Sequence, residues 1–412
     1  MRMIGRERLR APARVICVEL TSLSGAKEID VEGYETLWCL TRSHGSPLSI
    51  SFWDVTGDRS VAPGAIVEQL RATGEFGDVD AGMALPPIAN NDMEMTVAIC
   101  THERPEDLRR ALVSLAEQRD SNFRTLIVDN APRTRSTADV VSASQLSDCD
   151  YVIEPQKGLS RARNAALAHI SSEYVAWFDD DEVADADWIG RLKQGFRHET
   201  RPAAVCGLML PAELETGPQI LFEQYGGFNK GRDLYPEALH RGAPSVISPY
   251  YPLPAIGSGG NMAFRTESLR SAGGFDRDLG AGTRTHGGEE TKVFCSLLRS
   301  DETILHWPAA ITWHFHRRNM DQLLKQFYGY SAGLSAFYAS VLRSDPSAVW
   351  DIIRLFPHAL RDLGLRDGGL KFGELPDEFP RELLRAGRRG LAAGAISYVY
   401  EALSGSLGGW RV

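Results

Sequence analysis

The hydrophobic and polar positions of the chain follow three different patterns from one end to the other. In the first, extended β-rich runs flank a Ser-His-Gly-Ser-Pro turn at residues 43–47, which predicts a hairpin. The flanking runs lie at residues 34–40 and 48–55, and a separate β-rich run lies at residues 14–20. Residues 73–92 are rich in glycine, proline and asparagine, a composition typical of a linker. We therefore predict a small β-rich accessory domain plus a linker over residues 1–92.

The second pattern begins near residue 95, where short apolar runs alternate with amphipathic helical patterns. The apolar runs predict strands at residues 95–100, 125–128, 151–153, 174–178, 203–209, 257–264, 303–306 and 311–313. Helices are predicted to begin at Pro105, Gly158, Trp188 and Gly287. This alternation predicts an α/β domain over residues 93–320, a Rossmann-like mixed, mostly parallel sheet flanked by helices.

The third pattern is helical, and residues 321–412 are predicted to form a helical C-terminal region. The last helix candidate, residues 381–404, begins with four arginines and continues apolar to Leu403. This helix could make a peripheral contact with an anionic membrane surface, or it could dock on the α/β domain. Residues 211–256 fit no pattern; an irregular insertion of this length in a compact domain is usually functional.

Composition narrows the class of protein. The 412 residues suffice for two or three domains, and the net charge of −9 argues against general nucleic-acid binding. The six cysteines show no Cys-x-x-Cys spacing, which favours a reduced, cytoplasmic protein over a disulfide scaffold. The sequence has no apolar run long enough to span a bilayer, and its N-terminus lacks the apolar core of a signal peptide.

Candidate chemistry begins where the buried strand at 174–178 stops at four consecutive acids, Asp179 to Glu182. Open α/β sheets bind their ligands at the carboxyl ends of strands. Side chains alternate along an extended chain, so Asp179 and Asp181 are expected to point the same way. Two carboxylates on one side suit Mg²⁺ or Mn²⁺ carrying a diphosphate. The competing interpretation is a solvated acidic turn that caps the helix beginning near Trp188.

Other chemically active side chains also follow predicted strands. They are Thr101, Glu103, Asp129, Arg163, Glu289, Glu290 and His314. Because they lie at strand ends or in the loops just after, one crevice could collect them together with the acids.

These motifs together resemble a family 2 glycosyltransferase of the GT-A fold over roughly residues 93–335. The resemblance rests on Ile99-Cys-Thr-His-Glu-Arg-Pro, Leu126-Ile-Val-Asp-Asn, Gly158-Leu-Ser-Arg-Ala-Arg-Asn, Phe178-Asp-Asp-Asp, Gly260-Asn-Met-Ala-Phe-Arg, Gly273-Gly-Phe-Asp, Gly287-Gly-Glu-Glu and His314-Phe-His-Arg. Each motif alone is weak, but eight in family order at sensible spacing are specific. The family implies an enzyme that moves a sugar from a nucleotide-diphosphate sugar, with UDP-sugars as the default, to an acceptor hydroxyl.

The resemblance implies a nucleotide-binding group. Asp129 would accept a hydrogen bond from the base, and the turn carrying Thr101 and Glu103 would line the same pocket. Arg163 would approach the diphosphate or sugar, and Asp180 belongs to the same group. Helix capping is the alternative for Thr101, and a position on a helix surface is the alternative for Arg163.

The resemblance also implies a metal site of the Asp-x-Asp (DXD) type. Asp181 would bind Mn²⁺ or Mg²⁺, Asp179 would contact ribose or the metal, and His314 would complete the shell, with His316 as a competitor. The cation would neutralise charge on the departing nucleoside diphosphate.

Glu289 and Glu290 match the acidic pair that the family commonly writes as Glu-Asp. The second acid is the usual general base, so Glu290 is the predicted base in a single displacement with inversion. Because a glutamate replaces the aspartate, Glu289 stays open as the carboxylate that reaches the acceptor. Acids that only favour a helix dipole are the alternative.

Two other functions fit parts of the sequence. A sugar-nucleotide pyrophosphorylase has a phosphate loop that Gly280-Ala-Gly-Thr-Arg superficially resembles, but here the motif comes late in the chain. A non-catalytic carbohydrate-binding protein with a degenerate transferase fold is the second alternative. The acceptor could be a saccharide, a lipid-linked saccharide or a natural product, and residues 211–256 are expected to help select it.

Overall fold

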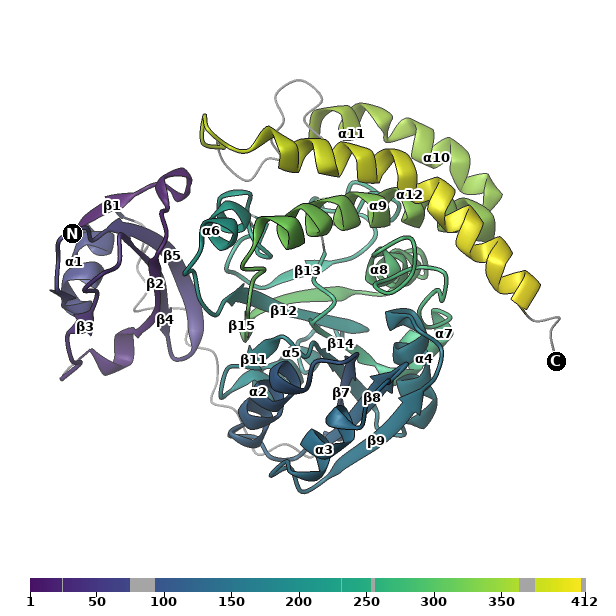
Figure 1. Ribbon diagram of the computed structural model, residues 1–412, viewed down its shortest axis with the longest axis horizontal. Coiled ribbons are helices and arrows are strands. Elements are labelled where there is room, and N and C mark those ends of the chain that lie inside the picture. Colours follow the sequence, from purple (N-terminus) through teal and green to yellow (C-terminus); the bar gives the residue numbers. More distant parts are fainter. Residues whose placement is uncertain (24, 75–92, 231, 253–255, 363–374, 409–412) are drawn as a thin grey trace.

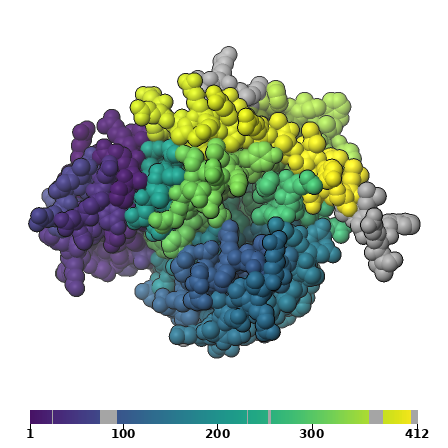
Figure 2. Space-filling model, viewed as in Figure 1, coloured from purple at the N-terminus to yellow at the C-terminus, as the bar shows by residue number. Residues whose placement is uncertain are grey.

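The computed structural model describes residues 1–23, 25–74, 93–230, 232–252, 256–362 and 375–408. An N-terminal sheet, a central α/β domain and a layer of helices from the C-terminal part follow one another along the chain (Figure 1). Figure 2 shows the C-terminal helices, in light green and yellow, covering the upper side of the α/β domain. Most of the predicted linker at 73–92 lies outside the described residues.

The N-terminal sheet has the strand order β1-β5-β4-β2. Its strands are β1 (Arg2–Ile4), β2 (Ala13–Glu19), β4 (Thr36–Ser43) and β5 (Ser46–Asp54). β4 and β5 form the predicted hairpin, and its turn places His44 and Gly45 at positive φ. A small pair, β3 (Ile29–Asp30) and β6 (Ser60–Val61), lies beside it with helix α1 (Pro63–Ala72). Short 3₁₀ turns lie at Arg6–Arg8 and Leu20–Ser22.

Alternate positions of β4 pack on opposite sides of this sheet. Leu37 and Cys39 belong to the domain's own core against α1, whereas Trp38 and Leu40 belong to a cluster shared with the α/β domain. The backbone N–H of Ala13 also donates to the carbonyl of Leu214, 2.8 Å away. The period of two therefore gives the sheet one face for itself and one face for docking.

The central sheet has the strand order β11-β15-β12-β14-β10-β7-β8-β9, with β13 also paired to β15. Its strands are β7 (Met95–Thr101), β8 (Arg124–Asn130), β9 (Cys149–Glu154), β10 (Tyr174–Phe178), β11 (Glu182–Ala184), β12 (Ala204–Pro211), β13 (Glu237–Leu239), β14 (Asn261–Arg265) and β15 (Ile304–His314). β11, β13 and β14 run antiparallel to their neighbours, and the others share one direction. The prediction of a mixed α/β sheet flanked by helices is therefore confirmed.

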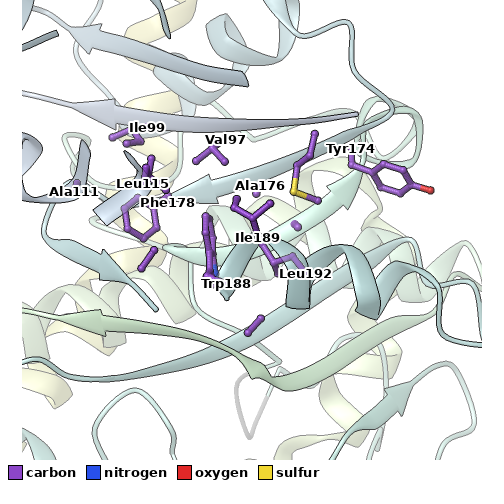
Figure 3. Close-up of a cluster of buried hydrophobic side chains, with 14 of the residues drawn as sticks. Val97, Ile99, Ala111, Leu115, Tyr174, Ala176, Phe178, Trp188, Ile189 and Leu192 are labelled. Atoms are coloured by element: carbon purple, nitrogen blue, oxygen red, sulfur yellow. The ribbon is translucent and has the colours of Figure 1, made fainter. Parts of the chain in front are cut away.

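Helices cover both faces of this sheet. They are α2 (Pro105–Ala116), α3 (Ser136–Ser142), α4 (Leu159–His169), α5 (Trp188–Phe196), α7 (Thr266–Ser271) and α8 (Glu289–Arg299). The central strand β10 serves both cores: Ala176 and Phe178 pack with α2 and α5, whereas Val175 and Trp177 pack with α4, α7 and α8. Figure 3 shows the first cluster, where Phe178 lies beside Trp188. Burial on both faces explains why this strand reads as an unbroken apolar run.

The C-terminal region is helical, as predicted. Its helices are α9 (Met320–Ser344), α10 (Val349–Arg354), α11 (Phe356–Asp362) and α12 (Arg381–Gly408), with a 3₁₀ turn at Pro346–Ala348. α9 and α12 pack closely because α12 presents glycines to α9: a Cβ at Gly390 would lie 2.1 Å from the carbonyl oxygen of Tyr328. Of the helices in the described ranges, none is long and apolar enough to cross a membrane.

Two sequence predictions need correction. The insertion at 211–256 contains helix α6 (Gly217–Gln224), which begins with a capping box formed by Thr216 and Gln219. The strands predicted at 303–306 and 311–313 are one strand, β15. Its partner β12 shifts register between Cys206 and Leu208, which accommodates the proline-containing middle of β15.

Candidate active site

The four acids after β10 lie in a turn, in which the N–H of Glu182 points to the carbonyl of Asp179 at 3.3 Å. The chain is therefore not extended here, and the expected alternation of Asp179 and Asp181 does not apply. Instead the carboxylates have different partners. Asp179 lies 3.6 Å from the guanidinium of Arg163, whereas Asp181 lies 3.4 Å from Nε2 of His314.

Asp180 and Asp181 are buried and share Arg104, whose Nη1 lies 3.1 and 2.9 Å from their oxygens. Burial raises the pKa of Asp180 to about 7, and the charge of Asp181 adds to this effect. Burial would also raise the pKa of Asp181, but His314, Arg317 and Arg104 hold that pKa well below its usual range. The acids are thus a buried, charge-paired group, which the alternative of a solvated turn does not describe.

His314 reaches Asp181 because β15 and β11 pair antiparallel, with His314 opposite Glu182. The strand brings the late histidine back to the first acids across more than 130 residues. His316, the competitor, lies behind His314 and away from Asp181: the two Nδ1 atoms are 2.9 Å apart, and Nε2 of His316 lies 3.1 Å from Glu223.

Glu289 and Glu290 begin α8, whose N-cap Gly288 has φ of 92°. A Cβ at Gly288 would lie 2.5 Å from the carbonyl oxygen of Gly333, so helix α9 packs directly on the start of α8. Glu289 is buried, while Glu290 is partly exposed. Burial raises the pKa of Glu289 to about 8, with the Glu290 charge adding to the rise and Arg163 opposing it.

Arg163 links the two carboxylate groups. Its guanidinium donates to Glu289 at 3.0 Å and to the carbonyl of Gly259 at 2.9 Å, in addition to its contact with Asp179. It is buried between Trp177 and Phe275, so the alternative of a helix-surface position is wrong.

The remaining predicted nucleotide-binding residues have structural contacts of their own. Asp129 is fully buried and accepts a 2.7 Å hydrogen bond from Tyr151, and burial raises its pKa. Thr101 donates to Asp180 at 2.6 Å, whereas the N-cap of α2 is Arg104, so Thr101 does not cap that helix. Glu103 accepts from the backbone N–H groups of Arg133 and Thr134, at 2.7 and 3.2 Å, and so fixes the loop after β8.

A cavity of about 880 Å³ collects these groups, a volume in the range of small-molecule sites. Its lining includes all three aspartates, both glutamates of α8, His314, Arg163 and Thr101. Two of the predicted nucleotide-binding residues, Asp129 and Glu103, do not line it. Asn130 lines it beside Asp129, and residues of α9 and α12 complete the wall. The cavity therefore lies between the α/β domain and the C-terminal helices.

One family model matches the central part of this chain. Residues 96–270 match the family model described as Glycosyl transferase family 2. These residues form a family 2 glycosyltransferase domain. The match spans the first strand, the acids after β10 and the strand β14, and the resemblance to this family predicted from the motifs is confirmed.

Two curated proteins are similar to this chain. The succinoglycan biosynthesis protein ExoM of Rhizobium meliloti (strain 1021) is 26% identical over 250 residues, covering 56% of this chain and 73% of that protein. The pre-mycofactocin glycosyltransferase of Mycobacterium tuberculosis (strain ATCC 25618 / H37Rv) is 26% identical over 251 residues, covering 60% of this chain and 48% of that protein. This chain thus spans about half the length of the mycobacterial relative.

A solved structure, the mannosyltransferase PcManGT from Pyrobaculum calidifontis in complex with GDP-Man and Mn²⁺, aligns with a TM-score of 0.43 at 17% identity. The alignment covers 77% of this chain and 81% of that one.

Sequence reasoning missed several residues that lie beside the acids. Arg104 and Arg317 both contact Asp181, at 2.9 and 3.3 Å, and both line the cavity. Both stand inside quoted motifs, and three adjacent buried acids require nearby cations, which is the signal that could have found them. Glu182 is the other omission: it is buried, and burial raises its pKa well above the ordinary range.

Asp181 and His314 offer an oxygen and a nitrogen atom to a divalent cation. Among the residues of the described ranges, no three His, Cys, Asp or Glu side chains form a ready metal cluster. Asp181 and His314 do face one another at 3.4 Å, and ligand atoms that are each about 2.1 Å from one cation can be this far apart. Magnesium sites commonly use one or two protein ligands and complete the shell with substrate phosphate and water. The residues fit a cation that arrives with a diphosphate.

Proposed function

We propose that this protein transfers a sugar from a nucleotide-diphosphate sugar, by default a UDP-sugar, to an acceptor hydroxyl with inversion at the anomeric carbon. The observation that carries this proposal is that one cavity holds both the Asp181–His314 pair and the Glu289–Glu290 pair. The buried Arg163 contacts Glu289 and also Asp179, which lies two residues before Asp181. The first pair suits a diphosphate with its cation, and the second suits a proton acceptor.

The donor half of the cavity would bind the diphosphate through opposite charge. Asp181 and His314, with Asp179 beside them, would hold Mn²⁺ or Mg²⁺, which when bound supplies charge for the departing diphosphate. Arg104 and Arg317 line the same cavity, where each pairs with Asp181, and their guanidinium groups could turn toward phosphate oxygens of a bound diphosphate. Thr101, Glu103, Asp129 and Asp180 would shape the nucleoside pocket around β7 and β8.

The acceptor half would carry out the proton transfer. Glu290 is the partly exposed acid of its pair, so it can take the proton from the acceptor hydroxyl. The hydroxyl oxygen then forms a bond to the anomeric carbon, the bond from that carbon to the diphosphate oxygen breaks on the opposite side, and its electrons leave with the diphosphate. Glu289 holds Arg163 and is the alternative base.

A sugar-nucleotide pyrophosphorylase remains a weaker candidate. Its phosphate loop would be Gly280–Arg284, yet in this fold that loop packs against Gly158, with a Cβ at Gly282 only 3.2 Å from the Cα of Gly158. The buried acids also count against a non-catalytic carbohydrate-binding protein, because sugar binding alone does not require them.

The acceptor and its location are proposals as well. The outward side of α12 exposes Ile396, Val399, Tyr400 and Leu403, at helical spacing. Together with arginines at the start of α12, this surface could bring a cytoplasmic enzyme to a membrane that presents a lipid-linked saccharide; a saccharide or natural-product acceptor would not need it.

Purified protein with a panel of UDP-, GDP- and dTDP-sugars and MnCl₂ tests the proposal. One donor should raise the melting temperature and be hydrolysed slowly, and NMR of the transfer product should show inverted configuration. No binding and no hydrolysis with any donor would favour the carbohydrate-binding alternative. Formation of a nucleotide-sugar from sugar 1-phosphate and UTP would favour the pyrophosphorylase. Retained configuration would refute the single displacement.

A further inference from the structure

A chain of buried polar contacts leads from the site into the N-terminal sheet. Nε1 of Trp38 on β4 donates to Glu223 at 3.1 Å, and the other carboxylate oxygen of Glu223 lies 3.1 Å from Nε2 of His316. Nδ1 of His316 lies 2.9 Å from Nδ1 of His314, and Nε2 of His314 faces Asp181. All five side chains are more than 90% buried.

The direction of this chain follows from what each group can do. An indole N–H only donates, and an ionised carboxylate only accepts. The burial of Glu223 would raise its pKa, but His316, Arg6 and Trp38 hold that pKa below its usual range, so Glu223 accepts from both sides. His316 then carries its proton on Nε2 and presents a lone pair on Nδ1. His314 must donate from Nδ1, which leaves Nε2 as its ligand atom.

Packing fixes the members of the chain in place. Phe228 lies edge-on to His314 at 4.7 Å between ring centroids, and Phe222 lies edge-on to His316 at 4.9 Å. Gly227, with φ of 56°, makes room for the carboxylate: a Cβ there would lie 2.2 Å from Oε1 of Glu223. The glycine is therefore required twice, by its backbone angle and by the carboxylate beside it.

The N-terminal sheet that carries Trp38 is docked firmly. Trp38 and Leu40 share an apolar cluster with β12, β15 and α6. Arg42 pairs with Asp185 at 2.7 Å, and the side-chain amide of Gln224 donates to the carbonyls of Glu7 and Leu9. Trp38 thus has a fixed position relative to α6, which carries Glu223.

We propose that the N-terminal sheet is part of the catalytic apparatus, with Trp38, Glu223 and His316 as positioning residues that present Nε2 of His314 to the cation. This inference rests on the proposed function, in which His314 is a metal ligand. It gives residues 1–74 a role in cation binding that the family 2 match, which begins at residue 96, does not cover.

Glu223→Gln tests the direction of the chain. Trp38 still requires an acceptor, so the amide oxygen must face the indole and the amide NH₂ must face His316. His316 then carries its proton on Nδ1, so His314 can no longer donate from Nδ1. The proton of His314 is held on Nε2, where it blocks the cation. We expect Mn²⁺ affinity to fall roughly 10- to 100-fold, the range for groups that orient metal ligands. Trp38→Phe alone should weaken it less, because Glu223 keeps its bond to His316.

The double variant Trp38→Phe/Glu223→Gln should bind Mn²⁺ more tightly than Glu223→Gln alone, because the amide can now turn its oxygen to His316. A merely structural role would make the double variant worse. Trp53→Phe is the matched control: Trp53 is also a buried tryptophan of the N-terminal sheet, but its indole donates to Ser51. Because Glu223→Gln preserves shape, it remains informative even if Trp38→Phe fails to fold.

Two measurements on the full chain compare these variants, one of Mn²⁺ affinity and one of the histidine tautomers. Electron paramagnetic resonance of free Mn²⁺, with and without UDP, gives the affinity. Long-range ¹⁵N–¹H spectra of histidine-labelled protein without metal give the tautomers. In the wild type, Nδ1 of His314 should carry a proton, and His316 should carry its proton on Nε2 and none on Nδ1. A bare Nδ1 on His314, unchanged affinity in Glu223→Gln, or no rescue would overturn the proposal. If wild type binds no Mn²⁺, the metal in the proposed function fails, while the tautomers still decide the positioning chain.

Discussion

The two carboxylate groups of the cavity consist of the same chemical groups in opposite electrostatic surroundings. Asp181 is buried, yet His314, Arg317 and Arg104 hold its pKa well below the usual range. Glu289 is equally buried and has one cation, Arg163, and its pKa rises to about 8. Burial alone therefore does not set the charge of an acid in this cavity; the number of cations beside it does.

This difference suits two tasks. A carboxylate that stays charged at neutral pH can receive a metal ion, whereas an acid whose pKa is raised toward neutral pH, as that of Glu289 is, can exchange a proton near neutral pH. Arg163 contacts an acid of each group, Asp179 and Glu289. The difference in pKa between the two groups therefore depends on how closely the guanidinium lies to each of these carboxylates.

The largest effect is expected from Glu290→Gln, which removes the proposed general base. Removing a general base typically lowers turnover 10²- to 10⁴-fold, and we expect a loss of that size with donor binding unchanged. Steady-state transfer rates and isothermal titration with the nucleotide-sugar check the two halves of the statement. Near-normal turnover in this variant would move the base to Glu289.

Asp181→Asn removes a carboxylate charge from the aspartate group. Changes behind a metal ligand already cost 10- to 100-fold in affinity. Loss of Asp181, the proposed direct ligand, should therefore weaken Mn²⁺ binding at least about 100-fold. Glu106→Gln is the control, since Glu106 is an exposed acid on α2 paired with Arg109. Equal Mn²⁺ affinity in Asp181→Asn and wild type would remove this aspartate from the cation site.

Arg163→Met removes the cation that the two groups share. Leaving a buried charge without its partner typically costs 3–5 kcal/mol, and we expect the free energy of unfolding to fall by about that amount. Arg163→Lys should lose less, because it keeps the charge but cannot bridge Glu289 and Gly259 at once. The exposed Arg109→Met should stay within about 0.5 kcal/mol in urea titrations. A loss that small for Arg163→Met would show that neither group needs the guanidinium.

The sequence predicted the strand ends well because period and composition are local properties. It placed Asp181, His314 and Glu289 at the same edge of the sheet, and the structure brings all three into one cavity. It could not predict the turn after β10, whose partners Arg104 and Arg317 are fixed by tertiary packing. Glu223 was missed, although the capping box of Thr216 and Gln219 is a sequence signal for the start of its helix, α6. Its bond to Trp38 spans 185 residues, a distance at which local patterns carry no information.

The smallest effect is expected from the raised pKa of Glu289, which should make the free energy of unfolding depend on pH. Its pKa is about 8 in the folded protein against an ordinary 4.5, so the folded state binds this proton more tightly. The stabilisation is complete below about pH 4.5 and is lost as pH rises through about 8. Glu289→Gln cannot titrate, so relative to wild type its unfolding free energy should rise by at most about 1.4 kcal/mol per pH unit across that interval. Loss of the Glu289–Arg163 contact changes the unfolding free energy by a constant amount, and this does not alter its slope against pH. Urea titrations at pH 5.5, 6.5 and 7.5 measure it, and parallel curves would mean that Glu289 is charged throughout, like Asp181.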